Sequence, residues 1–230
     1  MRRVLASLLI ATFAVGCGSA APSASVGSPS STVAVSPTSS TPPSASASVS
    51  ASASAQALTS GDLAPGAYTR PEFEPRVTFT VDEGWTAGTL ATGFFDIQQQ
   101  PATPDVIAVQ FARVDGVVGD AGALVDVPDA QEAVDTIKSN PGLQVVGESE
   151  SLLGGKAGVV MEVQNTSGSH TQILQVPPGR LGIDSGRQLW IALFDASDGL
   201  LAVMVGGSID DWDHALAVAE PVLESIVIGE

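Results

Sequence analysis

The chain has little cysteine and little basic charge, and each scarcity excludes something. Cys17 is the only cysteine among 230 residues, so the chain contains no intramolecular disulfide. Lysine and arginine together number nine, against 25 aspartate and glutamate residues. Nucleic-acid binding and flat docking on anionic lipid both require a basic surface. We therefore expect no nucleic-acid partner and no purely electrostatic contact with a membrane.

The sequence also lacks the motifs of common catalytic and metal sites. No Gly-x-Ser-x-Gly motif marks a hydrolase nucleophile. His170 and His214 are the only histidines, and without a cysteine partner they do not form a zinc signature. Asp195 and the aspartates within 210–213 lack the spacing of a calcium-binding loop. These absences predict no catalytic residue, no metal site and no cofactor, and hence a protein that is not an enzyme.

Residues 1–16 have the composition of a signal peptide. Arg2 and Arg3 precede an apolar run over 4–15, which is too short to cross a bilayer as a permanent helix. The run ends in Ala14-Val15-Gly16-Cys17, which resembles the lipobox of bacterial lipoproteins. The resemblance implies that Cys17 is lipidated and holds the protein on the extracytoplasmic face of the cell membrane. An ordinary secretory signal is the alternative interpretation.

Residues 17–57 are predicted to be a disordered tether. From position 18 to 57 the chain contains only Gly, Ser, Ala, Thr, Pro, Val and one Gln, without charge or aromatic side chains. Such a segment buries too little apolar surface to offset the entropy of ordering. An O-glycosylated stalk has the same composition and stays open. Without Arg2 and Arg3, seven basic residues face 25 acidic ones, which gives the mature chain a net charge of −18.

Residues 58–230 are long enough for one globular domain, and their patterns predict an α+β fold. Tyr68 and Phe73 are expected to pin residues 58–75 to the domain. Alternating or apolar segments predict strands at 77–81, 94–98, 106–111, 143–149, 158–163, 172–176, 188–194 and 200–205. The glycine-rich segment 116–127 is interpreted as a loop, and 165–187 as the least regular part of the domain.

Two helices are predicted between and after these strands. Asp129 is suited to cap the first, with Glu132 three residues later, and the helix stops before Asn140-Pro141-Gly142. The last helix carries an apolar stripe with spacings of four and three residues at Trp212, Leu216, Ala219, Leu223 and Ile226. Segments 188–194 and 200–205 are apolar on both faces, which predicts central strands covered on both sides. Strands in hairpin succession with two helices indicate an antiparallel sheet flanked by helices.

The order of elements resembles the PsbP-like αβα sandwich, which is found among small bacterial envelope lipoproteins. The pieces that carry the resemblance are VTFTVDEGW at 77–85, Leu153-Gly154-Gly155 before a strand, the hairpin 188–205 and AEPVLESIVI at 219–228. The resemblance implies a binding or assembly module, with a protein partner or a lipid ligand in the envelope. It supplies no catalytic motif.

One set of residues is a candidate ligand site. Arg180 and Arg187 bracket the irregular segment of an otherwise acidic domain, and Trp190 follows on a central strand. Arginine suits carboxylate or phosphate groups, so the three residues are predicted to line a site for an anionic or amphipathic ligand. Pairing of the arginines with local carboxylates such as Asp184 is the alternative. We expect a non-enzymatic binding module, with a carrier or sensor of an amphipathic envelope ligand as the second possibility and an envelope hydrolase as the third.

Overall fold

The computed structural model describes residues 54–100, 105–197 and 199–229. The predicted signal peptide, Cys17 and the tether up to residue 53 lie outside the described residues. Chain contacts group the described residues as one compact unit. A short strand, β1 (Gln56–Ala57), lies before the predicted domain boundary at residue 58. Among the described residues, no helix has both the length and the apolar character needed to cross a membrane.

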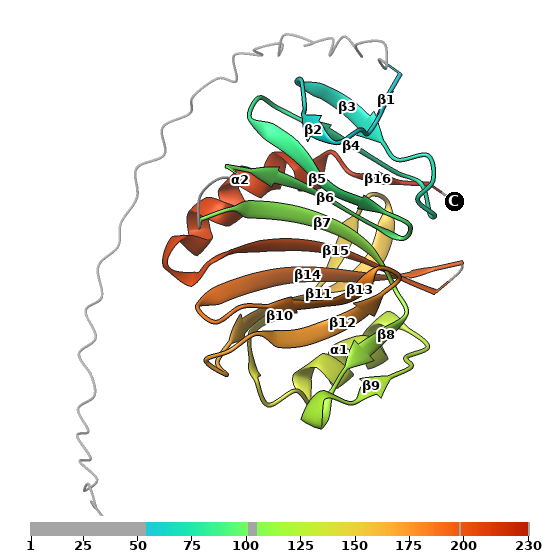
Figure 1. Ribbon diagram of the computed structural model, residues 1–230. Helices are drawn as coiled ribbons and strands as arrows, with labels where there is room; N and C mark the ends of the chain where they lie inside the picture. Colours follow the sequence, from blue (N-terminus) through green and yellow to red (C-terminus); the bar gives the residue numbers. More distant parts are fainter. Residues whose placement is uncertain (1–53, 101–104, 198, 230) are drawn as a thin grey trace, which may run out of the picture. The chain divides into compact units, whose positions relative to one another are not determined.

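An eight-stranded antiparallel sheet forms the centre of the fold (Figure 1). Each strand is hydrogen-bonded to the next in the order that follows. The strands are β10 (Leu143–Leu153), β11 (Lys156–Asn165), β14 (Arg187–Ala196), β15 (Gly199–Ser208), β7 (Ile107–Val114), β6 (Phe94–Gln99), β5 (Trp85–Ala91) and β2 (Gly61–Asp62). The sheet thus ends on one side in a long strand, β10, and on the other in a strand of two residues.

Two small sheets and two α-helices pack against the central sheet. One small sheet consists of β1, β3 (Gly66–Thr69), β4 (Val77–Val81) and β16 (Val227–Ile228), and the other of β13 (Gly179–Ile183), β12 (Thr171–Val176), β8 (Gly116–Val118) and β9 (Leu124–Val125). The helices are α1 (Ala130–Lys138) and α2 (Trp212–Glu224), with short 3-10 turns η1 (Asp120–Gly122) and η2 (Ile209–Asp211).

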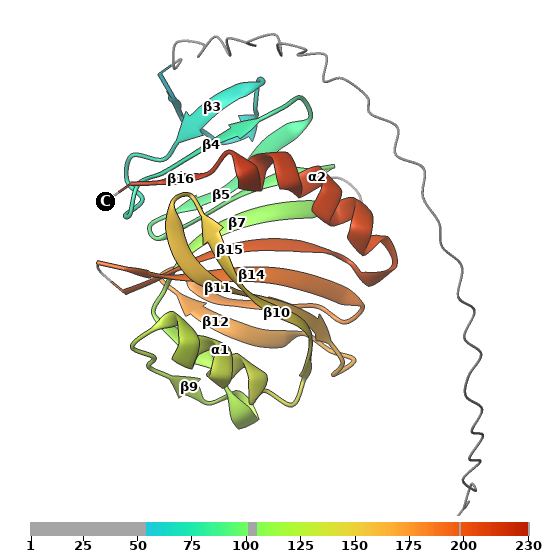
Figure 2. The same cartoon turned by 180° about the vertical axis from the view of Figure 1, so that it is seen from behind.

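Strands β14 and β15 are covered on both faces, as their sequences predict. In β15, Leu201, Val203 and Val205 belong to the core beneath α2 and the sheet that contains β4. The alternate residues Leu200, Ala202 and Met204 belong to the core beneath α1 and β12. Because neighbouring side chains of a strand point to opposite faces, each face of the sheet carries one helix and one small sheet. The predicted α+β class, an antiparallel sheet flanked by helices, is confirmed; Figure 2 shows α2 in front of the sheet.

The structure has strands where the sequence predicts none: β2 and β3 lie within 58–75, and two further segments also form strands. Residues 116–127, interpreted as a loop, contain the strands β8 and β9 with η1 between them. Residues 165–187 contain a second strand, β13, which pairs with β12. The strands in both segments are short and lie among glycines, so their apolar residues form no long periodic pattern. They gain order by completing the small sheet that covers α1's side of the core.

Helix α2 is buried along a slightly different stripe from the predicted one. Trp212 and Ala219 are buried as expected, but the other buried positions are Ala215 and Val222. Leu216 and Leu223 are only partly buried. Pro221 lies inside the helix.

Candidate functional site

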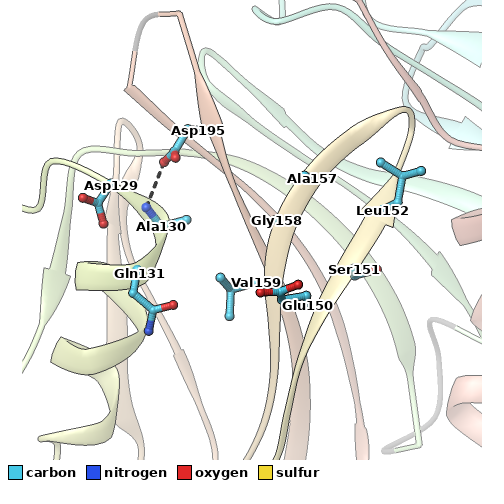
Figure 3. Close-up of a pocket in the computed structure, with 10 residues that line it drawn as sticks. All are labelled: Asp129, Ala130, Gln131, Glu150, Ser151, Leu152, Ala157, Gly158, Val159 and Asp195. Carbon is cyan, nitrogen blue, oxygen red and sulfur yellow. Dashed lines mark hydrogen bonds between the residues drawn. The ribbon is translucent and has the colours of Figure 1, made fainter.

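A cleft of about 720 Å³ lies between the start of α1 and the outer part of the β10–β11 hairpin (Figure 3). Its walls come from Asp129–Gln131 at the start of α1, Glu150–Leu152 of β10 and Ala157–Val159 of β11, with Asp195 at the end of β14. The helix start, the hairpin formed by β10 and β11, and the end of β14 are distant from one another in sequence. The fold therefore creates the cleft by bringing a helix start, a hairpin and a strand end together.

Two carboxylates fix the start of α1 at the edge of the cleft. The Asp129 side chain accepts a hydrogen bond from the Glu132 backbone N–H at 2.8 Å, which confirms the predicted cap. Asp195 Oδ1 accepts from the Ala130 N–H at 2.8 Å and ties the helix to β14 (Figure 3). Negative groups are favoured at a helix start, where unpaired N–H groups point outward. Both carboxylates are thus held in place without a positively charged side chain.

The hairpin wall of the cleft is anchored at its tip. Gly154 and Gly155 form the turn with φ values of 59° and 82°, which glycine adopts without strain. The Gly154 carbonyl accepts a hydrogen bond from the Ile228 N–H at 3.2 Å. A Cβ on Gly154 would come within 2.8 Å of the Ile228 side chain, so the turn lies directly against β16. This contact holds the hairpin on the rest of the fold.

The floor of the cleft is apolar and its charged groups are all acidic. Val159 and Glu150 are cross-strand partners, and Figure 3 shows both side chains in the space between the hairpin and α1. Leu152 is 74% exposed at the outer end. Among the described residues that line the cleft, only Asp129, Glu150 and Asp195 are charged. Within the described part of the chain, no hydrogen bond or ion pair engages the Glu150 side chain. The arrangement suits a cationic group carried on an apolar segment.

The three residues of the predicted ligand site are distributed over different parts of the fold. Arg180 lies exposed in β13, where Nη1 donates to Gln172 Oε1 at 2.6 Å and Nε to Gln175 Oε1 at 3.3 Å. Arg187 begins β14 and donates from Nη2 to the Val106 carbonyl at 2.8 Å. Trp190, three residues later on the same strand, faces α2 and borders a shallow hollow with Leu216 and Glu220. Since residues three apart in a strand point to opposite faces, Arg187 and Trp190 do not share a face. Ligand binding by these residues stays a prediction.

The two histidines lie apart from each other on the surface. His170 Nδ1 is 2.8 Å from Asp184 Oδ1, and both side chains are at least half exposed. Asp184 therefore pairs with this histidine. His214 is exposed on α2. Across residues 54–100, 105–197 and 199–229, no three His, Cys, Asp or Glu side chains are grouped so that they could hold a metal ion.

The acidic cleft was not predicted from the sequence. Asp129 was recognised as a helix cap and Asp195 as a turn residue, but neither was assigned to a site. Their proximity depends on the Ala130 to Asp195 hydrogen bond, which joins residues 65 positions apart. Glu150 follows the strand predicted at 143–149, and nothing in the sequence marked it as a site residue.

Known proteins resemble this chain in structure, but the comparisons of sequence found no match. No protein-family model and no curated protein sequence matches the chain. Cyanobacterial PsbP (CyanoP) from Synechocystis sp. PCC 6803 is similar over 75% of this chain and 98% of that chain, at 13% identity and a TM-score of 0.43. LpqN of Mycobacterium tuberculosis, involved in cell envelope biogenesis, is similar over 72% of this chain and 86% of that chain, at 12% identity and a TM-score of 0.37. PA94 of Pseudomonas aeruginosa is similar over 66% of this chain and 92% of that chain, at 14% identity and a TM-score of 0.40.

Proposed function

We propose that this protein is a membrane-anchored lipoprotein whose folded part binds a cationic segment of a partner protein outside the cytoplasm, without catalysing a reaction. The anchor rests on the signal-peptide pattern that ends in Gly16 and Cys17. The binding role rests on one observation, the cleft whose charged lining residues, Asp129, Glu150 and Asp195, are all acidic. Such a cleft attracts cations and disfavours anions, because charges of one sign at a concave surface add up.

The carrier of an amphipathic ligand is not part of this proposal. Arg180 and Arg187 of the candidate ligand site belong to residues 165–187, which pack on the central sheet. In that place, the side chains of Ile173, Leu174, Val176 and Ile183 pack into the core and are at most 4% exposed. The space is occupied by protein, so a lipid chain would have to displace a packed core.

The proposal is tested by titrating the full chain, purified in detergent, with a short lysine-rich peptide and measuring the heat of binding. We expect Glu150→Gln and Asp195→Asn each to weaken binding roughly two- to fivefold, the range for exposed ion pairs. The amide oxygen introduced by Asp195→Asn would still accept the Ala130 N–H, so the helix start is kept. Glu83→Gln is the matched control, because Glu83 is an exposed acid outside the cleft. Equal weakening by all three substitutions would contradict the proposal and indicate attraction by total charge alone.

A further inference from the structure

The outer side of β10 is an open edge of the central sheet. This strand has 11 residues and pairs with β11 on one side, and in the described part of the chain no strand pairs on the other. The opposite edge strand, β2, has only two residues. An edge strand presents a row of unpaired backbone N–H and C=O groups, which can pair with an added strand. The length of β10 makes it the edge with room for such an addition.

The regular part of this edge lies beside the cleft. The pairing of β10 with β11 is interrupted between Val145 and Gly147 and then runs without a break to Leu153. Glu148 contacts Lys138 of α1, and Glu150 and Leu152 line the cleft, so these alternate side chains face α1. Ser149 and Ser151 point to the other face by the same alternation. An added strand would therefore place every second side chain next to an acid or to exposed Leu152.

The charges along this edge favour one kind of added strand. Glu148 is engaged by Lys138 at 2.5 Å, whereas Glu150 has no described partner. A second copy of β10, paired antiparallel through this region, would set carboxylates opposite carboxylates, which is destabilising. A strand with lysine or arginine at alternate positions would set opposite charges across the pair. The same acids thus disfavour self-association and select a basic strand.

We propose that the cationic partner segment binds as an extended strand on the free edge of β10, along Glu148–Leu153, and forms backbone hydrogen bonds with it. This inference rests on the proposed function and adds the binding mode. Backbone pairing supplies affinity, and the alternate side chains supply specificity. The partner segment carries basic residues at every second position, small polar residues between them, and an apolar residue opposite Leu152.

The test uses the full chain in detergent and three synthetic peptides. The first alternates lysine and threonine and ends in valine, the second replaces lysine by glutamate, and the third keeps the lysines but carries N-methyl groups on alternate backbone amides. N-methylation leaves the charge unchanged and removes the donors that a strand needs. Binding is measured by calorimetry, and hydrogen–deuterium exchange follows the amides of Glu148–Leu153 that point away from β11.

We expect the lysine peptide to bind, to slow exchange at these amides, and to lose at least roughly tenfold in affinity on N-methylation, since several backbone hydrogen bonds are lost. Equal binding of the N-methylated peptide without slower exchange at β10 would overturn the strand addition and leave the proposed function intact. Failure of both lysine peptides to bind would overturn the two together. Binding of the glutamate peptide with equal affinity would also overturn both.

A charge reversal sharpens the assignment of the edge. Glu150→Lys is expected to weaken binding of the lysine peptide and to strengthen binding of the glutamate peptide, because the charge on the protein side of the cross-strand pair changes sign. Glu83→Lys alters the total charge equally at an exposed turn residue outside β10 and should leave the preference for lysine over glutamate in place. A switch of preference by both variants would show that the edge does not select the strand. Concentration-dependent dimerisation through β10 in the absence of peptide would contradict the inferred partner.

Discussion

Gly158 lies at the point where the backbone of β11 meets the ring of Phe194. A Cβ at this position would overlap both the Leu193 carbonyl oxygen and the edge of the Phe194 ring. Neither atom has room to move, because Leu193 and Phe194 are fully buried in the two cores. We expect Gly158→Ala to lower the free energy of unfolding by about 1–3 kcal/mol, the usual cost of overpacking. Denaturant titration of the full chain measures this change.

Gly147 provides the matched control on the neighbouring strand. A Cβ there would be 3.7 Å from the nearest atom, Glu162 Cβ, which is an ordinary contact distance. We expect Gly147→Ala to change the free energy of unfolding by less than about 0.5 kcal/mol. If both alanine variants were equally stable, the ring of Phe194 would be free to shift and the cleft floor would not be rigid.

At the scale of elements, an ion pair joins the end of α1 to β10. Lys138 Nζ lies 2.5 Å from Glu148 Oε2 and 3.5 Å from Asp135 Oδ1. The hydrogen bond to Glu148 raises the pKa of Lys138 above its ordinary value of 10.5, although desolvation opposes the rise. A raised pKa means that the folded state binds the proton more tightly than the unfolded state. The pair therefore stabilises the fold below pH 10.5 and loses this contribution as the pH rises through the folded-state pKa.

We expect the variant Lys138→Met to be less stable than the wild type at neutral pH, with a difference that shrinks as the pH is raised beyond 10.5. Denaturation midpoints at a series of alkaline pH values measure this difference. Lys156→Met is the control, because Lys156 lies beside the hairpin turn and takes part in no described salt bridge. If the difference in stability between Lys138→Met and the wild type stayed constant with pH, only the apolar stem of the Lys138 side chain would contribute to stability.

Elements with a strong local pattern could be predicted from the sequence. The cap at Asp129 and the two-sided burial of β14 and β15 were predicted from patterns of neighbouring residues. The order of the strands in the sheet could not be read, because β15 pairs with β7, which lies almost a hundred residues earlier. Strand β13 was missed since Gly182, which lies against the Thr171 carbonyl, interrupts its apolar pattern.

Buried polar residues were a second limit for prediction from the sequence. Asp96 is 2% exposed in the middle of β6, a position where an acid normally indicates solvent. Its Oδ1 accepts from the Thr89 N–H at 2.6 Å, where the pairing of β5 with β6 is irregular. The carboxylate thus satisfies a backbone donor that the irregular strand leaves unpaired. Only the partner strand makes this role visible, as only the fold makes the acidic cleft visible.

At the scale of the whole molecule, charge and the proposed anchor act in opposite directions. In the proposed lipoprotein, the chain without residues 1–16 has seven basic and 25 acidic residues and is repelled by an anionic membrane surface. Salt screens this repulsion beyond roughly 8 Å at physiological ionic strength, but screening creates no attraction between the protein and the membrane. In the proposed lipoprotein, attachment to the membrane therefore comes from the lipid on Cys17, where each buried methylene contributes about 0.8 kcal/mol.

The substitution Cys17→Ser, made in bacterial cells, removes the proposed site of lipidation. We expect the wild type to stay with the membrane fraction after a high-salt wash and to incorporate labelled fatty acid, because its attachment is apolar and covalent. The serine variant should lose the label, since no other cysteine can accept the lipid. Ser19→Ala, two residues further on, is the control and should behave as the wild type. A wild type that incorporates no labelled fatty acid, or a serine variant that still incorporates it, would contradict the lipoprotein interpretation.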